Sequence, residues 1–409
     1  MVADVLQQQH AEAEARRETT EADALEVALQ DHDRGRWAAY LRGDGVLTLV
    51  TDPPGARVTL YDLQESHRIR HPVLIDDIGR APVVARSLPM GSYLVVIEAD
   101  GHVPVRYPIQ ITRQHHWSGV RTGRTDPDPI VLPPQDALGP DDCYVPAGWF
   151  LAGGDPAANN SLPAQRLWLD GFVIRRFPVT LAEYVEFLND LLRQGRAAEA
   201  DEHAPVAPAW ERGPDRHEYG VERDGSGLFV VAGPPDRPRW PVVNVSWHGA
   251  AAYAAWLAGR DRLPWRLVAE MEHEKAFRGV DGAYFPWGNA FEPTYCKNRL
   301  SAPGRSMRTT VDEYPADESI YGVRGLAGNV HSWCADPYQL LGPALVDDAP
   351  QMSDGSDVVG PGAGGAHRMV RGGSWRDPEA NLRGAYRDCP PATYRDTVIG
   401  FRIARPFPG

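Results

Sequence analysis

Beyond Gly279 the chain loses every long hydrophobic period, and this loss constrains the fold more than any other feature. The regular pieces that remain are short and rich in glycine and aromatic residues: "YFPWGN", "GVRGLAGNVHSWCAD", "RMVRGGSW" and "IGFRIAR". The whole sequence contains 40 Gly and 37 Pro, residues that favour turns over long helices. We therefore expect an α+β fold in which ordered loops carry much of the chain.

The charge balance limits the classes of partner. The formal net charge is −13, so no global field attracts nucleic acid or an anionic membrane. No apolar run approaches the roughly 20 residues that a membrane-spanning helix requires. The four cysteines are far apart and form no CxxC pair, which favours a reducing cytoplasm over a disulfide framework. Residues 366–409 nevertheless hold eight Arg against four acidic residues, so this segment is locally cationic.

The hydrophobic pattern divides the chain into four parts. Residues 1–44 predict an acidic helical leader. Residues 45–120 predict a small all-β domain, with one hairpin in "GVLTLVTDPPGARVTLYDL" and a second strand pair in "LPMGSYLVVIEADGHVPVRYPIQI". Residues 121–142 are a Pro/Asp/Gly linker, and residues 143–409 form the large domain. The turn "PPGA" at 53–56 resembles the PEGA family, which implies a spacer or adhesion module without catalysis.

The large domain begins with a well-defined helix. Thr180 and Glu183 have the spacing of a capping box, in which each side chain bonds an orphan backbone amide. Apolar residues follow at helical spacing, from Tyr184 to Leu191, and Gly195 ends the pattern. A second helix is predicted after "PVVNVSW", with Tyr253, Trp256 and Leu257 on one face.

The large domain contains eight motifs in a fixed order: "YVPAGWFLAGGD", "LDGFVIRRFPVTLAEYVEFLN", "PVVNVSWHGAAAYAAWL", "RLVAEMEHEKAFRG", "FPWGN", "YGVRGLAGNVHSWCAD", "RMVRGGSW" and "IGFRIAR". Together these motifs resemble the formylglycine-generating-enzyme (sulfatase-modifying-factor) family. The resemblance covers nearly all of 143–409 and implies an elaborated C-type-lectin fold. Members of that family oxidise cysteine to formylglycine, build ergothioneine sulfoxide or bind ligands without catalysis, so the fold alone does not choose a function.

The metal sites of the family's enzymes are not matched. Formylglycine generators carry two cysteines shortly after "RGGS", and thiolates suit Cu(I). By matching the motif, those positions fall on Asp377 and on Asn381 or Leu382, and Cys389 is a single nearby thiol. The sulfoxide synthases take a three-histidine iron site from an H-x3-H-x-E run, which residues 1–140 lack. We therefore predict no catalytic residue, no metal ligand and no cofactor; the alternative is an oxidoreductase with an unrecognised metal site.

Structural calcium is compatible with the resemblance but is not supported by the residues. One family site uses a carboxylate in "GNxWEW", where this chain has Ser332 in "GNVHSW". A second would include Asn298, without an evident acidic partner. Glu270, His273 and Glu274 share a helical face. The family has the same glutamate pattern there, which favours carboxylates that bond loop amides over metal ligands.

Two further assignments concern the same region. A Ser-His-Asp assembly of Ser374, His331 and Asp336 has no supporting pattern in the sequence. The arginines divide into two classes: those in the motifs are expected to be buried supports (Arg371, Arg383 and Arg402), and those between the motifs are expected on a binding surface (Arg376, Arg387 and Arg395).

The C-terminal segment also resembles the variable proteins of diversity-generating retroelements, a branch of C-type-lectin-fold proteins in which template adenines are randomised. "RGGSW", "LR", "R" and "GFR" act as fixed supports between varying positions. Randomising the adenines of an AAC codon yields every residue type at those positions. We favour an ordinary family member whose loop drifted over this alternative. The varying positions would be Arg376, Asp377, Ala380, Asn381, Tyr386, Asp388, Cys389, Thr393, Tyr394, Asp396, Thr397 and Val398.

Both interpretations predict a cytoplasmic, non-catalytic protein whose C-terminal loops bind a protein or peptide, with a preference for acidic ligands through arginine. Similar domain arrangements occur in bacterial signalling proteins where the family domain follows a Ser/Thr kinase. This chain has no kinase motif, so such a kinase is expected as a separate partner or an absent N-terminal part. The predicted ligand-binding residues are Trp375, Arg376, Asp377, Asn381, Tyr386, Arg387, Asp388, Cys389, Tyr394, Arg395, Asp396 and Thr397.

Overall fold

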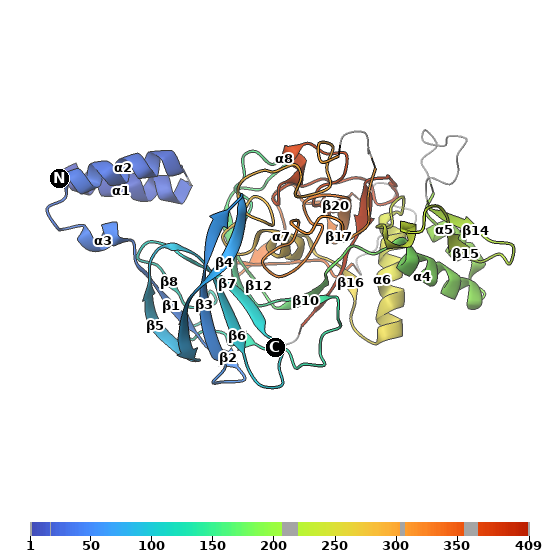
Figure 1. The fold of residues 1–409 in the computed structure, drawn as a ribbon, viewed down its shortest axis with the longest axis horizontal. Helices are drawn as coiled ribbons and strands as arrows, with labels where there is room; N and C mark the ends of the chain where they lie inside the picture. The colour runs from blue at the N-terminus through green and yellow to red at the C-terminus, as the bar shows by residue number, and fades with distance from the viewer. Residues whose placement is uncertain (1, 17, 207–219, 303–306, 356–366, 408–409) are drawn as a thin grey trace.

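Three helices precede the first strand in the computed structural model, which describes residues 2–16, 18–206, 220–302, 307–355 and 367–407. Helices α1 (Val2–Arg16) and α2 (Thr19–His32) lie side by side as a hairpin, and α3 (Ala38–Arg42) leads into the strands (Figure 1). The Arg113 guanidinium contacts Glu14 of α1 at 3.2 Å and Glu26 of α2 at 2.6 Å. These ion pairs attach the helical hairpin to the β region.

Residues 45–117 form two small sheets around a shared apolar core. One sheet is antiparallel, with the order β4 (Ile69–Arg80), β3 (Arg57–Ser66), β6 (Gly91–Glu98), β7 (Val105–Ile111). The other has the order β5 (Val83–Leu88), β1 (Gly45–Leu49), β8 (His116–Trp117). The buried side chains between them include Leu47, Val58, Leu60, Val95 and Ile109.

The hairpin predicted around the Pro-Pro-Gly turn is wrong. β1 pairs with β5 and β8, while both sides of β3 are occupied by β4 and β6. Between them, β2 (Thr51–Asp52) pairs in parallel with β9 (Ile130–Val131), which lies in the segment expected as a linker. Alternation of apolar residues specifies which face of a strand is buried, but it leaves the neighbouring strand undetermined. The second predicted strand pair occurs as β6 and β7.

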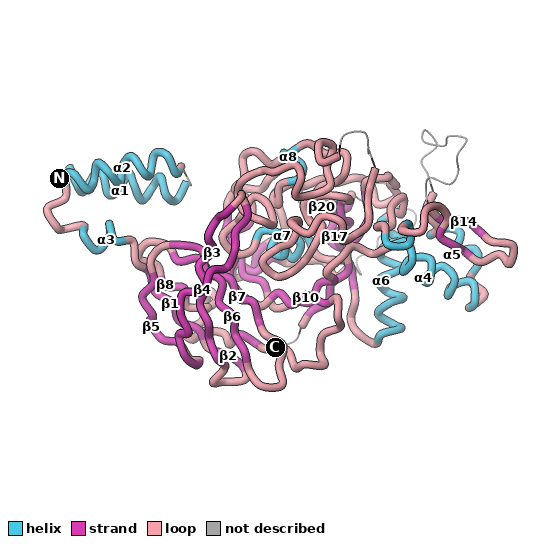
Figure 2. Tube along the Cα trace, in the orientation of Figure 1, coloured by secondary structure: helices cyan, strands magenta, loops and turns pink. Residues whose placement is uncertain are grey.

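Loops make up much of the large domain, and short elements lie between them (Figure 2). Its main sheet has the order β10-β13-β22-β16, and a second has the order β20-β17-β21. The strands are β10 (Asp142–Val145), β11 (Gly148–Ala152), β12 (Gln165–Leu169), β13 (Phe172–Arg175), β14 (Val221–Arg223), β15 (Phe229–Val231), β16 (Arg266–Leu267), β17 (His331–Pro337), β18 (Leu345–Val346), β19 (Ala349–Pro350), β20 (Arg368–Arg371), β21 (Ile399–Phe401) and β22 (Ile403–Pro406). The helices are α4 (Leu181–Arg193), α5 (Ala197–His203), the 3₁₀ turn η3 (Arg237–Arg239), α6 (Trp247–Asp261), α7 (Glu270–Arg278) and α8 (Glu379–Leu382).

The first helix of the large domain, α4, has the predicted capping box. Glu183 accepts a hydrogen bond from the Thr180 amide at 2.8 Å, and the Thr180 hydroxyl accepts one from the Glu183 amide at 3.3 Å. The apolar face of α4 packs on α6 and β21. The Tyr184 and Tyr253 rings lie 5.8 Å apart, and Tyr253 lies 5.4 Å from Phe401.

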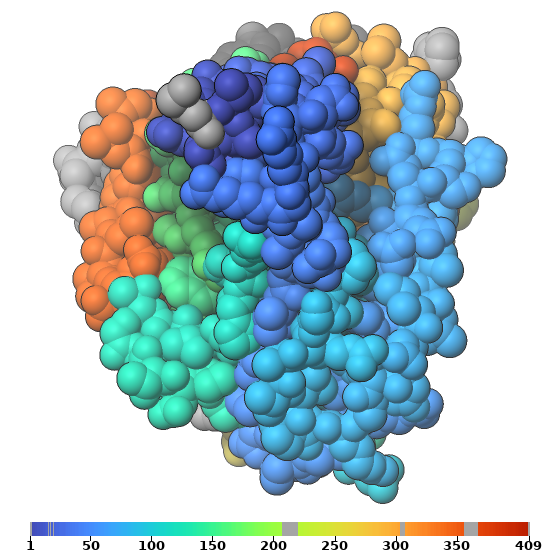
Figure 3. Space-filling view, turned by 90° about the vertical axis from the view of Figure 1, so that its left-hand side faces the viewer, coloured from blue at the N-terminus to red at the C-terminus, as the bar shows by residue number. Residues whose placement is uncertain are grey.

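The β region is joined to the large domain by polar contacts. Arg70 on β4 forms an ion pair with Asp281 at 2.6 Å, and Arg106 on β7 donates to the Ile320 carbonyl at 2.5 Å. The Tyr295 hydroxyl donates to the His67 carbonyl at 2.5 Å. In the space-filling view of Figure 3, the N-terminal helices lie above this β region. None of the helices in the described ranges is long and apolar enough to cross a membrane.

Replacing Thr180 with alanine tests the capping box. Thr180→Ala should destabilise α4 by about 1 kcal/mol, because the Glu183 amide loses its acceptor. That cost corresponds to a melting temperature roughly 2–4 °C lower for a domain of this size. Thr180→Ser keeps the hydroxyl and should melt close to the parent. Equal melting temperatures for the two variants in a thermal-denaturation scan would show that the cap contributes nothing.

Candidate functional site

Helix α7 is buried over its whole length, and two of its carboxylates pair with arginines of the C-terminal segment. Glu270 accepts a hydrogen bond from Arg387 at 2.6 Å. Glu274 pairs with Arg278 at 2.6 Å and with Arg371, and each side chain of the three is at most 1% exposed. Since an unpaired charge at these positions would be strongly destabilising, the pairs fix the C-terminal segment to α7 at two points.

The same arginines also serve the loop backbone. Arg371 donates to the carbonyls of Ala385 at 3.1 Å and Tyr386 at 2.6 Å. Arg387 donates to the Gln339 carbonyl at 2.8 Å. A buried carbonyl in a loop needs a hydrogen-bond donor, just as a buried carbonyl in a sheet does. The loop from 371 to 387 is therefore held as a closed, ordered unit.

The predicted ligand-binding residues do not all reach the surface. Tyr386, Arg387 and Asp396 are 6%, 2% and 7% exposed, so the expectation that they contact a ligand is corrected: they support the loop from within. Val398, expected at a varying surface position, is also buried. Arg376 and Asp388 are exposed, and the remaining residues are half-buried: Trp375, Asp377, Asn381, Cys389, Tyr394, Arg395 and Thr397.

The arginines follow only part of the predicted division. Arg371, Arg383 and Arg402 are buried, as expected. Arg395 donates to the carbonyls of Ala204 and Glu202, both at 2.7 Å. Arg376 pairs with Asp396 at 3.2 Å and keeps a side chain that is 51% exposed. Arg387 and Arg395 therefore donate to acceptors of this chain, whereas the prediction had placed both on a binding surface.

A polar cluster lies where the family's cysteine positions fall. Asp377 accepts hydrogen bonds from His331 at 2.9 Å, from the Ser374 hydroxyl, and from Asn381 at 3.1 Å. Asn381 in turn accepts from the Asn159 amide at 2.7 Å. Five side chains from three separate segments therefore meet at this point. We call these five residues the Asp377 cluster.

The geometry makes His331 a cation. Its Nε2 faces Asp377 and its Nδ1 faces the Gly372 carbonyl at 2.7 Å, so both ring nitrogens have acceptors and both carry hydrogen. Burial alone would lower the pKa of His331, but the hydrogen bond and charge of Asp377 raise it above its usual value. Burial alone would raise the pKa of Asp377, but His331, Ser374 and Asn381 lower it to about 2.

The Ser-His-Asp assembly considered above does not form. Asp336 lies elsewhere, where its carboxylate accepts from the amides of Glu270 at 2.5 Å and Ser353 at 2.9 Å. Ser374 and His331 both donate to Asp377 instead. The hydroxyl therefore faces a carboxylate and not an imidazole base, so this arrangement does not activate a serine nucleophile.

The donor set does not fit the family's copper. At the cysteine positions the cluster offers a carboxylate oxygen and an amide, whereas Cu(I) selects soft sulfur ligands. Cys389 is half-buried, and burial raises the pKa of its thiol, so it is protonated at neutral pH. Within the described ranges, no three His, Cys, Asp or Glu side chains lie together as a metal centre requires.

The residues proposed for calcium and for the glutamate cluster have other partners. The Asn298 side-chain oxygen accepts from the Leu300 amide at 2.8 Å, and its nitrogen donates to the Pro293 carbonyl at 2.8 Å, which closes a turn. Ser332 is buried in β17. Glu274 also accepts from the Gly153 amide at 2.7 Å, the loop-amide role expected from the sequence.

Sequence reasoning did not assign His331 and Asn159 to this cluster. The signal for His331 was a difference from the family motif: this chain has histidine where "GNxWEW" has its first tryptophan. Its partner Asp377 departs from the same family at a cysteine position. One of these two differences adds a group that can carry a positive charge and the other adds a negative charge. Such a complementary pair is a signal that the two side chains are in contact. Asn159 gave no signal, because it lies in a loop with no motif of its own.

These features belong to a known class of protein. Residues 130–407 match the family described as the sulfatase-modifying factor enzyme 1-like domain, so the chain is a member of that family. It is 31% identical over 296 residues to a formylglycine-generating enzyme of Thermomonospora curvata, which covers 64% of this chain and 91% of that protein. Membership confirms the family predicted from the motifs, with its C-type-lectin-like fold.

Two further comparisons are more limited. The chain is 30% identical over 266 residues to the serine/threonine-protein kinase Pkn1 of Chlamydia trachomatis, covering 64% of this chain but 38% of the kinase. The match therefore spans well under half of that relative. The solved structure of Treponema denticola variable protein 1 covers 66% of this chain and 100% of its own, with 19% identity and a TM-score of 0.44.

The ion pair in the Asp377 cluster predicts a pH-dependent stability. His331 contributes stability that is fully present below its unfolded pKa of about 6.5 and is lost as the pH rises through the raised folded value. Asp377 contributes stability that is present above 3.8 and is lost as the pH falls toward about 2. Asp377→Asn should therefore lower the melting temperature most between about pH 4 and 6.5.

The measurement is the melting temperature of the parent and Asp377→Asn across pH 3–9. Asp136→Asn is the control, because Asp136 is an exposed carboxylate outside the cluster. A difference between parent and Asp377→Asn that stays constant with pH would contradict the ion pair.

Proposed function

We propose that this protein is a non-catalytic binding member of its family, whose C-terminal loops recognise a protein or peptide. The observation that carries the proposal is the Asp377 cluster. Where the formylglycine generators place thiolates, this chain has a carboxylate neutralised by His331 and an amide bonded to Asn159. The ligands at this site are hard oxygen and nitrogen atoms that already have hydrogen-bond partners. Such a site favours a structural role over the redox chemistry of a soft metal ion such as Cu(I).

The loop surface supports recognition because its large side chains are fixed. The Trp375 indole donates to the Thr397 carbonyl at 3.3 Å, and the Tyr394 hydroxyl donates to Asp396 at 2.9 Å. Aromatic groups held in one position bind with little loss of conformational entropy. The exposed polar side chains Arg376 and Asp388 lie on the same ordered segment. This combination of rigid aromatic and adaptable polar groups is typical of a recognition loop.

Buried Arg387 also positions an apolar neighbour. It donates to the carbonyls of Gln339 at 2.8 Å and Leu340 at 3.4 Å, which fixes the loop after β17 beside residue 388. In that loop Leu340 and Leu341 are 73% and 86% exposed. Exposed leucines on a fixed loop mark an interaction surface. We therefore infer a ligand with an apolar contact as well as polar ones, in place of the acidic preference expected from composition.

The proposal includes no metal cofactor and places the protein in the cytoplasm, where its four cysteines stay as free thiols. Similarity to part of Pkn1 supports a Ser/Thr kinase as a signalling partner on a separate chain. Within this proposal, diversification by a retroelement is an alternative explanation for the sequence of the C-terminal loop. A near-identical DNA repeat with adenines at the varying codons would establish that origin, and its absence from the locus would remove it.

The binding surface is tested by selecting peptides from a random phage-displayed library on the parent protein. Peptides that bind should lose about tenfold in affinity for Leu340→Ser/Leu341→Ser and for Arg376→Ala/Asp388→Ala, because each pair removes part of the surface. Val84→Ser changes an apolar side chain in the β region that is 70% exposed, and should leave binding unchanged. Equal affinity for parent and both loop variants would place recognition elsewhere.

The enzyme alternative is tested separately. The copper-loaded protein is incubated with a cysteine-containing peptide and oxygen, and the Thermomonospora curvata relative serves as the positive control. We expect no aldehyde from this protein, because the cluster offers no thiolate pair. Formation of aldehyde, or stoichiometric copper or iron in the protein as purified, would overturn the binding proposal.

A further inference from the structure

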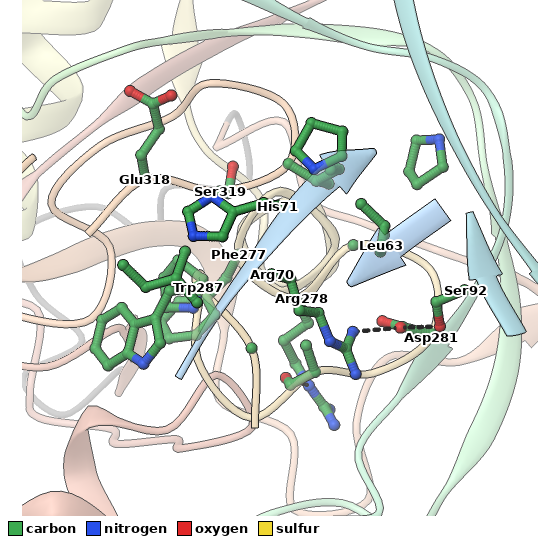
Figure 4. Close-up of a pocket in the computed structure, with 18 of the residues that line it drawn as sticks. Leu63, Arg70, His71, Ser92, Phe277, Arg278, Asp281, Trp287, Glu318 and Ser319 are labelled. Atoms are coloured by element: carbon green, nitrogen blue, oxygen red, sulfur yellow. Dashed lines mark hydrogen bonds and ion pairs between the residues drawn. The ribbon is translucent and has the colours of Figure 1, made fainter. Parts of the chain in front are cut away.

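A cavity of about 300 Å³ lies between the β region and the large domain, away from the C-terminal loops (Figure 4). One wall comes from β3, β4, β6 and β7, and the other from the end of α7 and the loops that follow it. Its size is at the lower end of the roughly 300–1,000 Å³ typical of small-molecule sites. No feature of the family motifs predicts it, since one of its two walls lies outside the family domain.

The cavity is held open by contacts that cross the interface. Asp281 accepts hydrogen bonds from Arg70 at 2.6 Å and from the Ser92 hydroxyl at 2.5 Å, which joins β4 and β6 to the loop after α7. The Arg70 amide also donates to the Trp287 carbonyl at 2.8 Å. Figure 4 shows Asp281 and Ser92 on one side of the cavity and Ser319, Glu318 and Trp287 on the other. The site is thus preformed and needs no closure to bind.

One buried polar group in the wall lacks a hydrogen-bond partner within the described part of the chain. Ser319 is 4% exposed, and its hydroxyl makes no hydrogen bond to any described residue. A buried hydroxyl normally has a partner, because leaving it unsatisfied is destabilising. Ser319 lines the cavity, so a ligand in the cavity is placed to supply that partner.

A cation lines the same cavity as this hydroxyl. Arg106 belongs to the lining, and its Nε donates to the carbonyl of Ile320 at 2.5 Å, the residue that follows Ser319 in sequence. One carboxylate of the wall, Glu318, acts electrostatically on Arg106, but its side chain is 46% exposed and lies 3.9 Å from Arg324. The other carboxylate in the wall, Asp281, is neutralised by Arg70. A guanidinium and a hydroxyl together match the two oxygens of a carboxylate.

Part of the wall is apolar. Phe277, Trp287 and Ile109 are at most 2% exposed and form part of the lining. We propose that the cavity binds a small carboxylic acid with an apolar body, its carboxylate on Arg106 and Ser319 and its body against Trp287 and Phe277. The acid is either a free metabolite or the C-terminal residue of a peptide. Because both walls contact it, such a ligand joins the β region to the large domain and stabilises the whole chain.

Phenylacetate is the first probe, with phenethylamine and 2-phenylethanol as matched probes that lack the carboxylate. Isothermal titration calorimetry on the full chain should show binding of phenylacetate at least about tenfold tighter than of either control, the worth of one charge-assisted hydrogen bond. N-acetyl-Gly-Phe and its C-terminal amide distinguish a peptide terminus from a free acid. Tighter binding of the dipeptide than of phenylacetate indicates the peptide source.

Ser319→Ala separates a ligand-binding role from a structural one. If the Ser319 hydroxyl has a structural role, its removal should lower the melting temperature of the protein. If the hydroxyl is unsatisfied and binds the ligand, its removal should leave the melting temperature equal or higher and should weaken phenylacetate binding about tenfold. Arg106→Gln should weaken binding further. Ser87→Ala, an exposed serine on β5, is the matched control.

Three results would overturn the site: no saturable binding of any acid probe at millimolar concentration, equal affinity for phenylacetate and phenethylamine, or unchanged affinity in Ser319→Ala. The loop variant Arg376→Ala/Asp388→Ala should bind phenylacetate like the parent. The site and the proposed loop recognition therefore fail or succeed independently.

Discussion

Buried arginines are the constraint on which the large domain depends. A chain with short strands and long loops leaves many interior carbonyls without ladder partners, and each needs a donor. Arg278 donates to the carbonyls of Gly153 and Gly282, and Arg402 donates to that of Gly325. A guanidinium presents five donors in a rigid plane, so one side chain satisfies several loops at once. The buried carboxylates of α7 offset the charge that these arginines bring inside.

This architecture determines where variation is tolerated. Arg371 and Arg387 fix the start and end of the C-terminal loop to α7, so exposed residues between them, such as Arg376, can differ without loss of the backbone path. In this chain one such difference lies at a cysteine position of the formylglycine generators, where Asp377 forms an ion pair with His331. A scaffold stabilised from within retains an ordered loop surface when residues at this position change, and this is consistent with the recognition function proposed for the loops.

Local pattern predicted local structure well. The Thr180–Glu183 capping box and the buried face of α4 depend on residues within one or two helical turns, and the structure has both. The ordered motifs identified the family. The strand pairing between β1 and β3 was predicted wrongly, because a strand's alternation does not name its neighbour. Arg387 was placed on the surface because it lies between motifs, but its partner Glu270 is over one hundred residues away in sequence.

The sequence by itself determined the family, the loop-rich character of the large domain and the absence of thiols at the positions that hold them in the formylglycine generators. These follow from residue identity and short spacings. Only the tertiary structure decided which arginines are internal, that Asp377 and His331 meet, and that a cavity opens between the β region and the large domain. Each of these depends on the burial and mutual distance of groups far apart along the chain. The burial of a group and its distance from other groups determine its charge state and its contacts. Composition and hydrophobic periodicity give no information about burial or distance between residues far apart in sequence.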